Sequence, residues 1–362
     1  PYFYVGGGNG AQLVDDTLTA MGWERIYDKT REDYKLKWCE IKSHNNYHNF
    51  RDAVLPNTQQ QTTHNKDRPA HLQEYDRVMN KVKKGKPSRC VISFFEHRIM
   101  RYQDFIPETY RLDIRDDREA FFEVYVDGEL WISKPTGMNQ GKGIYLIRNM
   151  ADIAKIQDRI VELEDEALNS RKLPFRSPMA RIVQRYIPNP LLLDGRKFDV
   201  RNYLLIACVN PLVVFYCDGY CRLTCMPYDL HSTDLTGHLT NQFMQKKNPL
   251  YEEVKEDTVW SMDKFNDYIN EHHMAQHNLP EDWVHVLLKR RCQQIMMQCF
   301  QAVRHKLECR LGFFDLIGCD FLVDDQFKIT LLEMNCNPAL HTNCETLREI
   351  MPDIVDETLS KF

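Results

Sequence analysis

The stretch GCDFLVDD (Gly318–Asp325), followed by ITLLEMNCNP (Ile329–Pro338), decides the fold of this chain. Both segments are rich in apolar residues, and the turn-like link between them predicts two antiparallel strands. In such a hairpin Asp320 can meet Glu333 and Asn335, which share one face because strand side chains alternate. Oxygen donors of this kind suit Mg²⁺, which also binds substrate phosphates. The hairpin therefore indicates either a magnesium site in a phosphate-handling enzyme or the ordinary charged ends of edge strands.

The composition is that of a soluble globular protein. The 362 residues are enough for two or three domains. Of these residues 43% are hydrophobic and 27% are charged, with a net charge of -5. No uninterrupted apolar run is long enough to span a bilayer, and we expect neither a membrane nor a nucleic acid among the partners. Because the first residue is Pro1 and not Met, we also expect the sequence to be part of a longer protein.

The twelve cysteines show no regular disulfide spacing. Most of them lie in apolar segments, where a free thiol behaves as a small hydrophobic side chain. We therefore expect a reducing, cytosolic compartment. Cys217, Cys221 and Cys225 do not have the spacing of a zinc site, and we expect strands there instead.

The first segment reads as a strand (Tyr2–Val5), a glycine turn (Gly6–Gly10) and a helix (Ala11–Met21). A dinucleotide site has a similar order, but the GxGxxG spacing fails, so a plain glycine turn is favoured. A basic, Gly/Pro-broken stretch, Lys81–Pro87, then predicts a domain boundary near Ser88.

A glycine-rich loop follows the expected strand Leu130–Pro135 and precedes another at Ile144–Ile147. Glycine lets a backbone approach phosphates closely, and Lys134 and Lys142 would add positive charge. The pattern is not a Walker loop. It indicates either a phosphate-binding loop or a flexible hairpin turn.

The strand Arg181–Ile187 ends at Pro188, which indicates either an adenine-binding edge or an interdomain linker. In the next strand Lys197, Asp199 and Arg201 share one face. These charges fit a phosphate contact, a ribose or adenine acceptor and a carboxylate clamp. The alternative is a surface salt-bridge ladder.

The rest of the carboxy-terminal half is expected to continue this sheet. We predict strands at Leu212–Tyr216 and Tyr220–Leu223, and a core helix from Val284 to Leu307. The polar segment Leu250–Asn278 reads as an insertion with a short helix from Met262 to Ile269.

Taken in order, the motifs resemble the tubulin tyrosine ligase-like family, amino-acid ligases built on the ATP-grasp fold. They are WISKPTGMNQGKGIYLI (131–147), QRYI (184–187), PLLLDGRKFDVRN (190–202), HLTN (238–241), GCDFLVD (318–324) and LEMNCNP (332–338). The resemblance implies an α+β protein with an N-terminal domain (1–88), a central domain (89–187) and a C-terminal domain (188–362). The ATP cleft would lie between the last two.

The resemblance also implies roles for the site residues. The ATP phosphates, adenine and the rest of the nucleotide would be held by Lys134, Gln140, Gly141, Lys142, Gly143, Gln184, Arg185, Tyr186, Ile187, Lys197 and Asp199. Asp320, Glu333 and Asn335 would hold magnesium. The reacting carboxylate or the incoming amino acid would meet Gln140, Arg201, Arg222, His238, Thr240 and Asn241, with Arg201, Arg222 and Glu333 as the catalytic set.

In the family reaction ATP phosphorylates a protein carboxylate, and the amine of a free amino acid attacks the acyl phosphate. The ending NCNPALHTNCE (335–345) is most similar to the branch that elongates polyglycine chains. Free glycine and an acceptor such as tubulin would then be the partners of a monomeric enzyme on the cytoskeleton, in the cytoplasm, a cilium or an axoneme. Asn337 stands where many relatives have Ser, and Arg185 where many have Lys. A glutamate ligase of the same fold and a catalytically silent, nucleotide-gated tubulin-binding protein stay as alternatives.

Overall fold

The computed structural model describes residues 1–28, 30–31, 33–39, 55–56, 101–136, 141–169, 180–307, 309 and 313–361. The expected boundary near Ser88, the basic stretch Lys81–Pro87 and the predicted site residue Gln140 lie outside these residues. The described parts form three sheets, which correspond to successive stretches of the chain.

The first sheet confirms the expected strand, glycine turn and helix. Its strand order is β2-β1-β3-β4, all parallel. The strands are β1 (Tyr2–Gly6), β2 (Glu24–Ile26), β3 (Leu36–Cys39) and β4 (Leu55–Pro56). Helix α1 (Ala11–Ala20) follows Gly10, whose φ of 66° is one that glycine adopts without strain.

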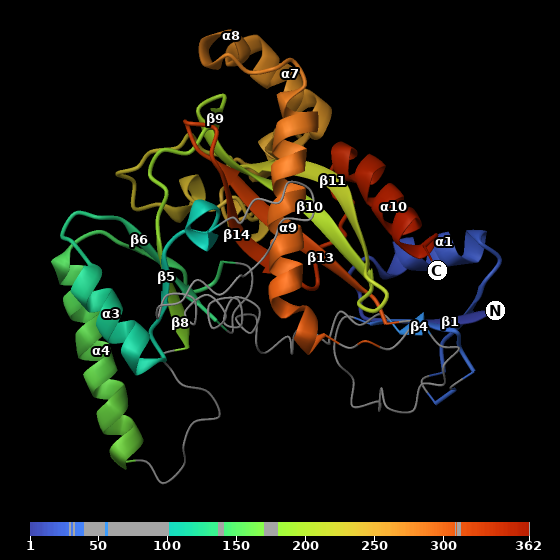
Figure 1. Ribbon diagram of the computed structural model, residues 1–362, viewed down its shortest axis with the longest axis horizontal. Coiled ribbons are helices and arrows are strands. Elements are labelled where there is room, and N and C mark those ends of the chain that lie inside the picture. The colour runs from blue at the N-terminus through green and yellow to red at the C-terminus, as the bar shows by residue number, and fades with distance from the viewer. Residues whose placement is uncertain are drawn as a thin grey trace.

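The second sheet is antiparallel, with the order β5-β8-β6-β7. Its elements are β5 (Thr109–Arg111), α3 (Arg115–Val124), β6 (Trp131–Pro135), β7 (Tyr145–Ile147), α4 (Met150–Asn169) and β8 (Arg181–Arg185). Phe121 and Trp131, both fully buried, pack edge to face with ring centroids 5.1 Å apart and join α3 to the sheet. Figure 1 shows α3 and α4 side by side at one end of the molecule.

The third sheet is the largest, in the order β12-β11-β10-β13-β14, with β9 paired to the start of β10. Its strands are β9 (Leu192–Leu193), β10 (Arg196–Cys208), β11 (Val213–Leu223), β12 (Val259–Ser261), β13 (Asp315–Val323) and β14 (Ile329–Asn335). The helices of this part are α5 (Gln242–Gln245), α6 (Tyr251–Val254), α7 (Met262–His272), α8 (Met274–His277), α9 (Lys289–Val303) and α10 (Glu345–Leu359). Neighbouring strands are antiparallel, so the predicted hairpin of β13 and β14 is confirmed.

Several sequence expectations differ from the structure here. The two expected strands after residue 212 form the single strand β11, which continues through Gly219. The segment Leu250–Asn278 is not a polar insertion, because β12 is an edge strand of the sheet and Trp260 and Phe265 are buried in its core. The predicted long helix begins with a π-helical turn, Val284–Leu288, before α9.

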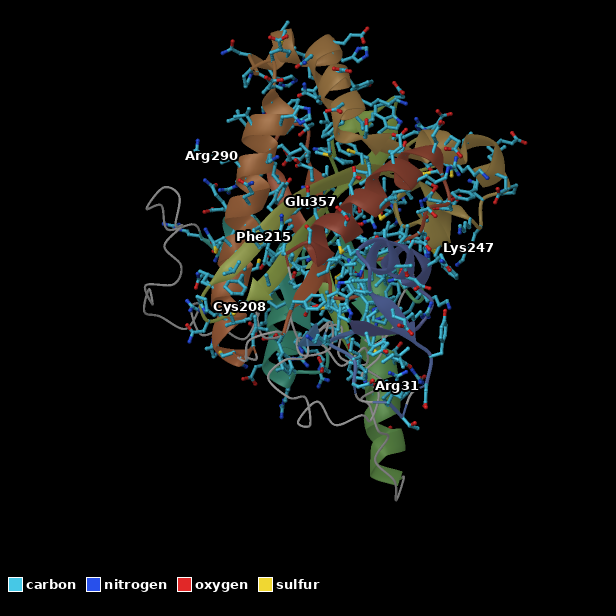
Figure 2. All side chains as sticks on the ribbon, turned by 90° about the vertical axis from the view of Figure 1, so that its right-hand side faces the viewer. Arg31, Cys208, Phe215, Lys247, Arg290 and Glu357 are labelled. Atoms are coloured by element: carbon cyan, nitrogen blue, oxygen red, sulfur yellow. The ribbon has the colours of Figure 1, made fainter. Side chains whose placement is uncertain are left out.

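The two faces of β10 pack against different parts of the molecule. Val200 and Leu204 join the core cluster under α7 and α9, whereas Tyr203 and Leu205 join a cluster with α1 and α10. Figure 1 shows α9 across one side of the long strands, with α10 and α1 together at the other end. Figure 2 views that end and labels Glu357 on α10. The first residues of β10, including Lys197 and Asp199, border a cavity together with residues of the central sheet. The predicted site lies at this cavity.

Two absences can be stated for the described residues. The cysteines among them are all free thiols, as expected. No helix in these parts of the chain is both long enough and apolar enough to cross a membrane.

Candidate active site

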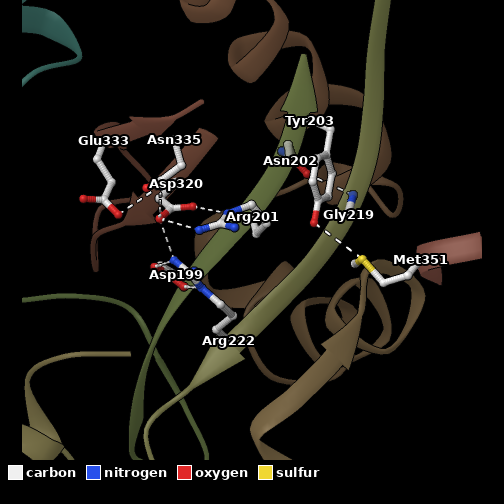
Figure 3. Close-up of polar contacts among 10 residues, drawn as sticks. All are labelled: Asp199, Arg201, Asn202, Tyr203, Gly219, Arg222, Asp320, Glu333, Asn335 and Met351. Atoms are coloured by element: carbon white, nitrogen blue, oxygen red, sulfur yellow. Dashed lines mark hydrogen bonds and ion pairs between the residues drawn. The ribbon is translucent and has the colours of Figure 1, made fainter. Parts of the chain in front are cut away.

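The site is built on a charged row that crosses the third sheet. Strand register places Arg201 of β10 opposite Asp320 of β13, and Asp320 opposite Glu333 of β14. Two residues before Arg201 in the same strand, Asp199 lies opposite Arg222 of β11. Because residues two apart in a strand share a face, these side chains meet on one side of the sheet. Figure 3 shows these side chains converging.

Two arginines and two aspartates form a continuous network. Arg201 binds both oxygens of Asp320, through Nε and through Nη2 at 2.9 Å. Arg222 binds both oxygens of Asp199, with Nε 2.8 Å from Oδ1, and also reaches Asp320 Oδ2 at 2.7 Å. From the sequence, these charges could either contact a ligand or form a salt-bridge ladder on the surface. In the structure the four side chains form ion pairs with one another, and Arg201 and Arg222 line a cavity.

All four residues are buried, at 9% exposure or less. Burial would raise the pKa of Asp320, but Arg201 and Arg222 outweigh it and hold that pKa below its usual range. For Asp199 burial dominates over Arg222, and its pKa is raised. Buried ion pairs add little net stability, because desolvation offsets their attraction. A network of this kind is better explained by a functional role than by stability.

The three predicted metal ligands lie together. The amide nitrogen of Asn335 donates to Asp320 Oδ2 at 3.3 Å and to Glu333 Oε1 at 3.0 Å. It thus occupies the point between two carboxylates that a cation would favour. Among the described residues no group of three or more His, Cys, Asp and Glu side chains has the arrangement of a metal site. Two carboxylates and an amide fit Mg²⁺ that completes its shell with phosphate oxygens and water.

Two lysines border this network, Lys134 from β6 of the central sheet and Lys197 from β10 itself. Lys134 of β6 donates to Gln184 Oε1 at 2.9 Å. Burial lowers the pKa of Lys134, against the attraction of Glu333 and Asp320. Burial likewise lowers the pKa of Lys197 to about 7, with the positive charge of Lys134 acting in the same direction.

A chain of hydrogen bonds holds the Lys197 ammonium. Lys197 Nζ donates to Tyr186 OH at 2.8 Å, and that hydroxyl lies 2.8 Å from His238 Nδ1. His238 Nε2 lies 3.1 Å from the carbonyl of Ser232, to which only a protonated nitrogen can donate. Burial lowers the pKa of His238. The neutral ring therefore accepts from Tyr186 and donates to Ser232, which places His238 behind Tyr186 as a support of Lys197.

Two adjoining cavities share this charged wall. A cavity of about 110 Å³ is lined by Tyr186, Ile187 and Lys197, and one of about 440 Å³ by Arg201 and Asn335. Both cavities are bordered by Lys134, Arg222, Asn241 and Glu333.

The glycine loop lies at the edge of the larger cavity. Gly141 has φ +74°, and a Cβ there would lie 2.8 Å from the amide nitrogen of Asn241. Lys142 Nζ lies 4.9 Å from the ring centroid of Phe243, and Gly143 accepts a hydrogen bond from Arg181. Loop and helix α5 thus meet over the cavity.

The remaining predicted residues differ in their placement. Thr240 and Asn241 line the smaller cavity, and Asn241 caps α5 by accepting from Met244 N. The Arg185 side chain points away, to Glu108 and Glu129, with its guanidinium over Trp131. Only the Arg185 backbone is thus placed for an adenine contact, because successive strand residues face opposite sides.

The sequence interpretation missed two residues at the site. Asn9 borders the larger cavity and bonds to the loop after β14. Arg148 donates to the carbonyls of Leu230 and Ser232 and so ties the end of β7 to the loop before His238. Neither residue belongs to a charge pattern that could have revealed it, because its partners are backbone groups or lie far away in sequence.

A mixed helix and sheet protein with this buried charge row beside two cavities fits the ATP-grasp-like class of proteins. The model of the tubulin-tyrosine ligase family matches residues 31–362, and the chain belongs to that family. Ligases of the family are ATP-dependent and generally need Mg²⁺.

Proteins similar to this chain include two named polyglycylases and a polyglutamylase. "Protein polyglycylase TTLL10" of Rattus norvegicus is 52% identical over 99% of this chain and 52% of its own length. "Inactive polyglycylase TTLL10" of Homo sapiens is 49% identical over 99% of this chain and 57% of its own. "Probable alpha-tubulin polyglutamylase Ttll1" of Tetrahymena thermophila is 27% identical over 95% of this chain and 81% of its own. The chain thus spans about half the length of the polyglycylases it matches.

Proposed function

We propose that this chain is an ATP- and Mg²⁺-dependent ligase that elongates polyglycine side chains on glutamate residues of a target protein, through an acyl phosphate. The observation that carries the proposal is the convergence of four basic side chains with the metal-type donor set at one cleft. These side chains belong to Lys134, Lys197, Arg201 and Arg222. Joining two anions, ATP and a carboxylate, needs such a concentration of positive charge.

The proposed role of each site residue follows from its position. Lys134 and Lys197 hold the phosphates, and the strand edge at Gln184–Ile187 takes the adenine in the smaller cavity. Asp320, Glu333 and Asn335 would hold Mg²⁺, which supplies charge neutralisation and orients the phosphates. Arg201 and Arg222 line the larger cavity, where they orient the carboxylate for in-line attack and oppose the charge that develops on it. The nucleotide thus lies between the central and C-terminal domains.

The choice of glycine rests on the relatives. The rat protein, 52% identical, is named a polyglycylase, whereas the ciliate polyglutamylase is 27% identical. The acceptor would be a glutamate-rich protein such as tubulin, with the ligase on the cytoskeleton. Labelled glycine and labelled glutamate, each offered with a monoglycylated peptide, ATP and Mg²⁺, decide the donor. Preferential incorporation of glutamate would assign the chain to the polyglutamylases instead.

Glu333→Gln tests the metal role. We expect glycine incorporation to fall by at least about 100-fold, because a neutral amide removes one of two carboxylates from a phosphoryl-transfer site. The matched control is Glu357→Gln, the same change on the exposed face of α10, which should retain full activity. Unchanged product formation by a folded Glu333→Gln protein would refute the metal assignment.

A catalytically silent protein is the second candidate, because the human relative is named inactive. Such a protein would bind the nucleotide and the acceptor without joining glycine to it. Saturable ATP binding without incorporation of either amino acid would favour this candidate.

A further inference from the structure

The glycine turn after β1 is bonded to the loop that follows β14. Asn9 Oδ1 accepts from Leu340 N at 2.8 Å, and Asn9 Nδ2 donates to the carbonyl of Pro338 at 2.7 Å. The same nitrogen donates to Asn337 Oδ1 at 2.8 Å. A Cβ at Gly10 would lie 2.8 Å from Leu340, so the contact also depends on a glycine.

These bonds fix the orientation of both amides. A backbone N–H can only donate and a backbone carbonyl can only accept. Leu340 N therefore requires the oxygen of Asn9, and the carbonyl of Pro338 requires its nitrogen. Because Asn9 presents its NH₂ to Asn337, the atom of Asn337 that faces it must be the oxygen.

The NH₂ group of Asn337 takes no part in this contact and can donate hydrogen bonds to another group. The described residues provide no hydrogen-bond acceptor for Asn337 Nδ2. Asn337 lines the cavity of about 440 Å³ that also borders Arg201 and Arg222. An N–H donor that borders the same cavity as two arginines suits an anion that accepts hydrogen bonds, of which a carboxylate is the simplest.

We propose that Asn9 is a positioning residue that turns the Asn337 NH₂ toward the cleft, where it binds a substrate carboxylate. The proposal rests on the function proposed above, which supplies two such groups: the carboxylate of free glycine and the acceptor carboxylate of the peptide. The Michaelis constants of the two substrates distinguish them.

Asn9→Asp is the informative variant. The new carboxylate still accepts from Leu340 N but cannot donate, so Asn337 must rotate its amide to offer its NH₂ to residue 9. The cleft then meets an oxygen in place of a donor. We expect the KM of glycine or of a monoglycylated peptide to rise at least about tenfold, as for a lost hydrogen bond to a charged group. The KM of ATP should stay within about twofold.

A double substitution separates positioning from general damage to the loop. Asn337→Ala should raise the same KM by a similar factor, and adding Asn9→Asp to it should change that KM no further. Additive effects of the two changes would mean that Asn9 does not act through Asn337, and the proposal would be overturned. Gln12→Ala, an exposed change on nearby α1, is the control and should alter no constant.

A binding measurement keeps the test independent of turnover. The full chain, saturated with a non-hydrolysable ATP analogue and Mg²⁺, is titrated calorimetrically with glycine and, separately, with the monoglycylated peptide. We expect one Kd to rise at least about tenfold in Asn9→Asp relative to the unaltered protein. Equal Kd values, or no binding of either compound to the unaltered protein, would refute the inference. Binding without ligation would refute only the proposed function.

Discussion

At the scale of single residues, the ammonium of Lys197 is the most unusual charge in the site. Burial lowers its pKa to about 7, and its one described hydrogen-bond acceptor is the hydroxyl of Tyr186. A bound polyphosphate would add its negative charge to that of Asp199 beside this ammonium and would raise the pKa of Lys197. The site therefore gains positive charge when its ligand arrives.

This titration predicts that nucleotide binding takes up protons. At pH 7.5 a group of pKa about 7 is mostly neutral, so we expect an uptake of roughly half a proton or more per nucleotide, and weaker binding as pH rises from 7 to 9. Calorimetry in two buffers of different ionisation enthalpy measures the uptake. Lys197→Arg, whose side chain stays charged, should bind nucleotide with little uptake. The same uptake in both proteins would show that another group titrates.

At the scale of elements, the β10–β11 pair depends on an irregularity beside the site. The register shifts between Arg201 and Tyr203, and Asn202 accepts a hydrogen bond from Gly219 N at 3.2 Å. A Cβ at Gly219 would lie 2.0 Å from the carbonyl oxygen of Arg201. Arg201 and Tyr203 share one face of β10, where Arg201 binds Asp320 and Tyr203, whose hydroxyl contacts Met351 in Figure 3, packs into the core.

Gly219→Ala should therefore be severely destabilising. The new methyl group overlaps backbone that cannot move without breaking the sheet, and we expect a loss of about 3 kcal/mol or more in the free energy of unfolding. Urea denaturation followed by circular dichroism measures it. Gly8→Ala is the matched control, because a Cβ at Gly8 meets nothing within 4 Å. If both variants were equally stable, the bulge would not need glycine.

The elements also show how far sequence reasoning reaches. Alternation along residues 197–201 correctly predicted which side chains share a face, and the apolar runs of 318–335 correctly predicted a hairpin that brings Asp320 to Glu333 and Asn335. The pairing of Arg201 with Asp320 was not predictable, because it depends on β10 lying between β11 and β13. Spacing within one segment carries no information on which distant strand will be its neighbour. The edge strand β12 was missed for the same reason, since only its position in the sheet shows its role.

At the scale of the whole molecule, the beginning and the end of the described chain share one core. Leu18 and Val14 of α1 pack in the same buried cluster as Met351 and Val355 of α10. Both helices lie beside the marked chain ends in Figure 1. The N-terminal sheet is thus attached to the large sheet through apolar contacts as well as through Asn9.

Leu18→Ala should accordingly lower the stability of the whole protein and not only that of the N-terminal sheet. Leu18 is 1% exposed, and removing a buried leucine side chain typically costs about 2–5 kcal/mol. We expect the unfolding midpoint to fall for the near-ultraviolet signal of the whole protein, with one transition. Thr19→Ala, one residue further on and exposed, should leave the midpoint unchanged. A separate early transition in Leu18→Ala would show that the N-terminal sheet unfolds independently.

The bonds from Asn9 to Asn337, Pro338 and Leu340 also bear on protein engineering. Chimeras between members of a ligase family usually exchange contiguous segments, and the stretch after β14 is an obvious one to transplant. Here the shape of that stretch is set by a residue 328 positions earlier in the sequence. A graft of residues 335–345 alone would bring its side chains into a host loop that no longer orients them. The two segments therefore behave as a single exchangeable unit, although the chain separates them almost completely.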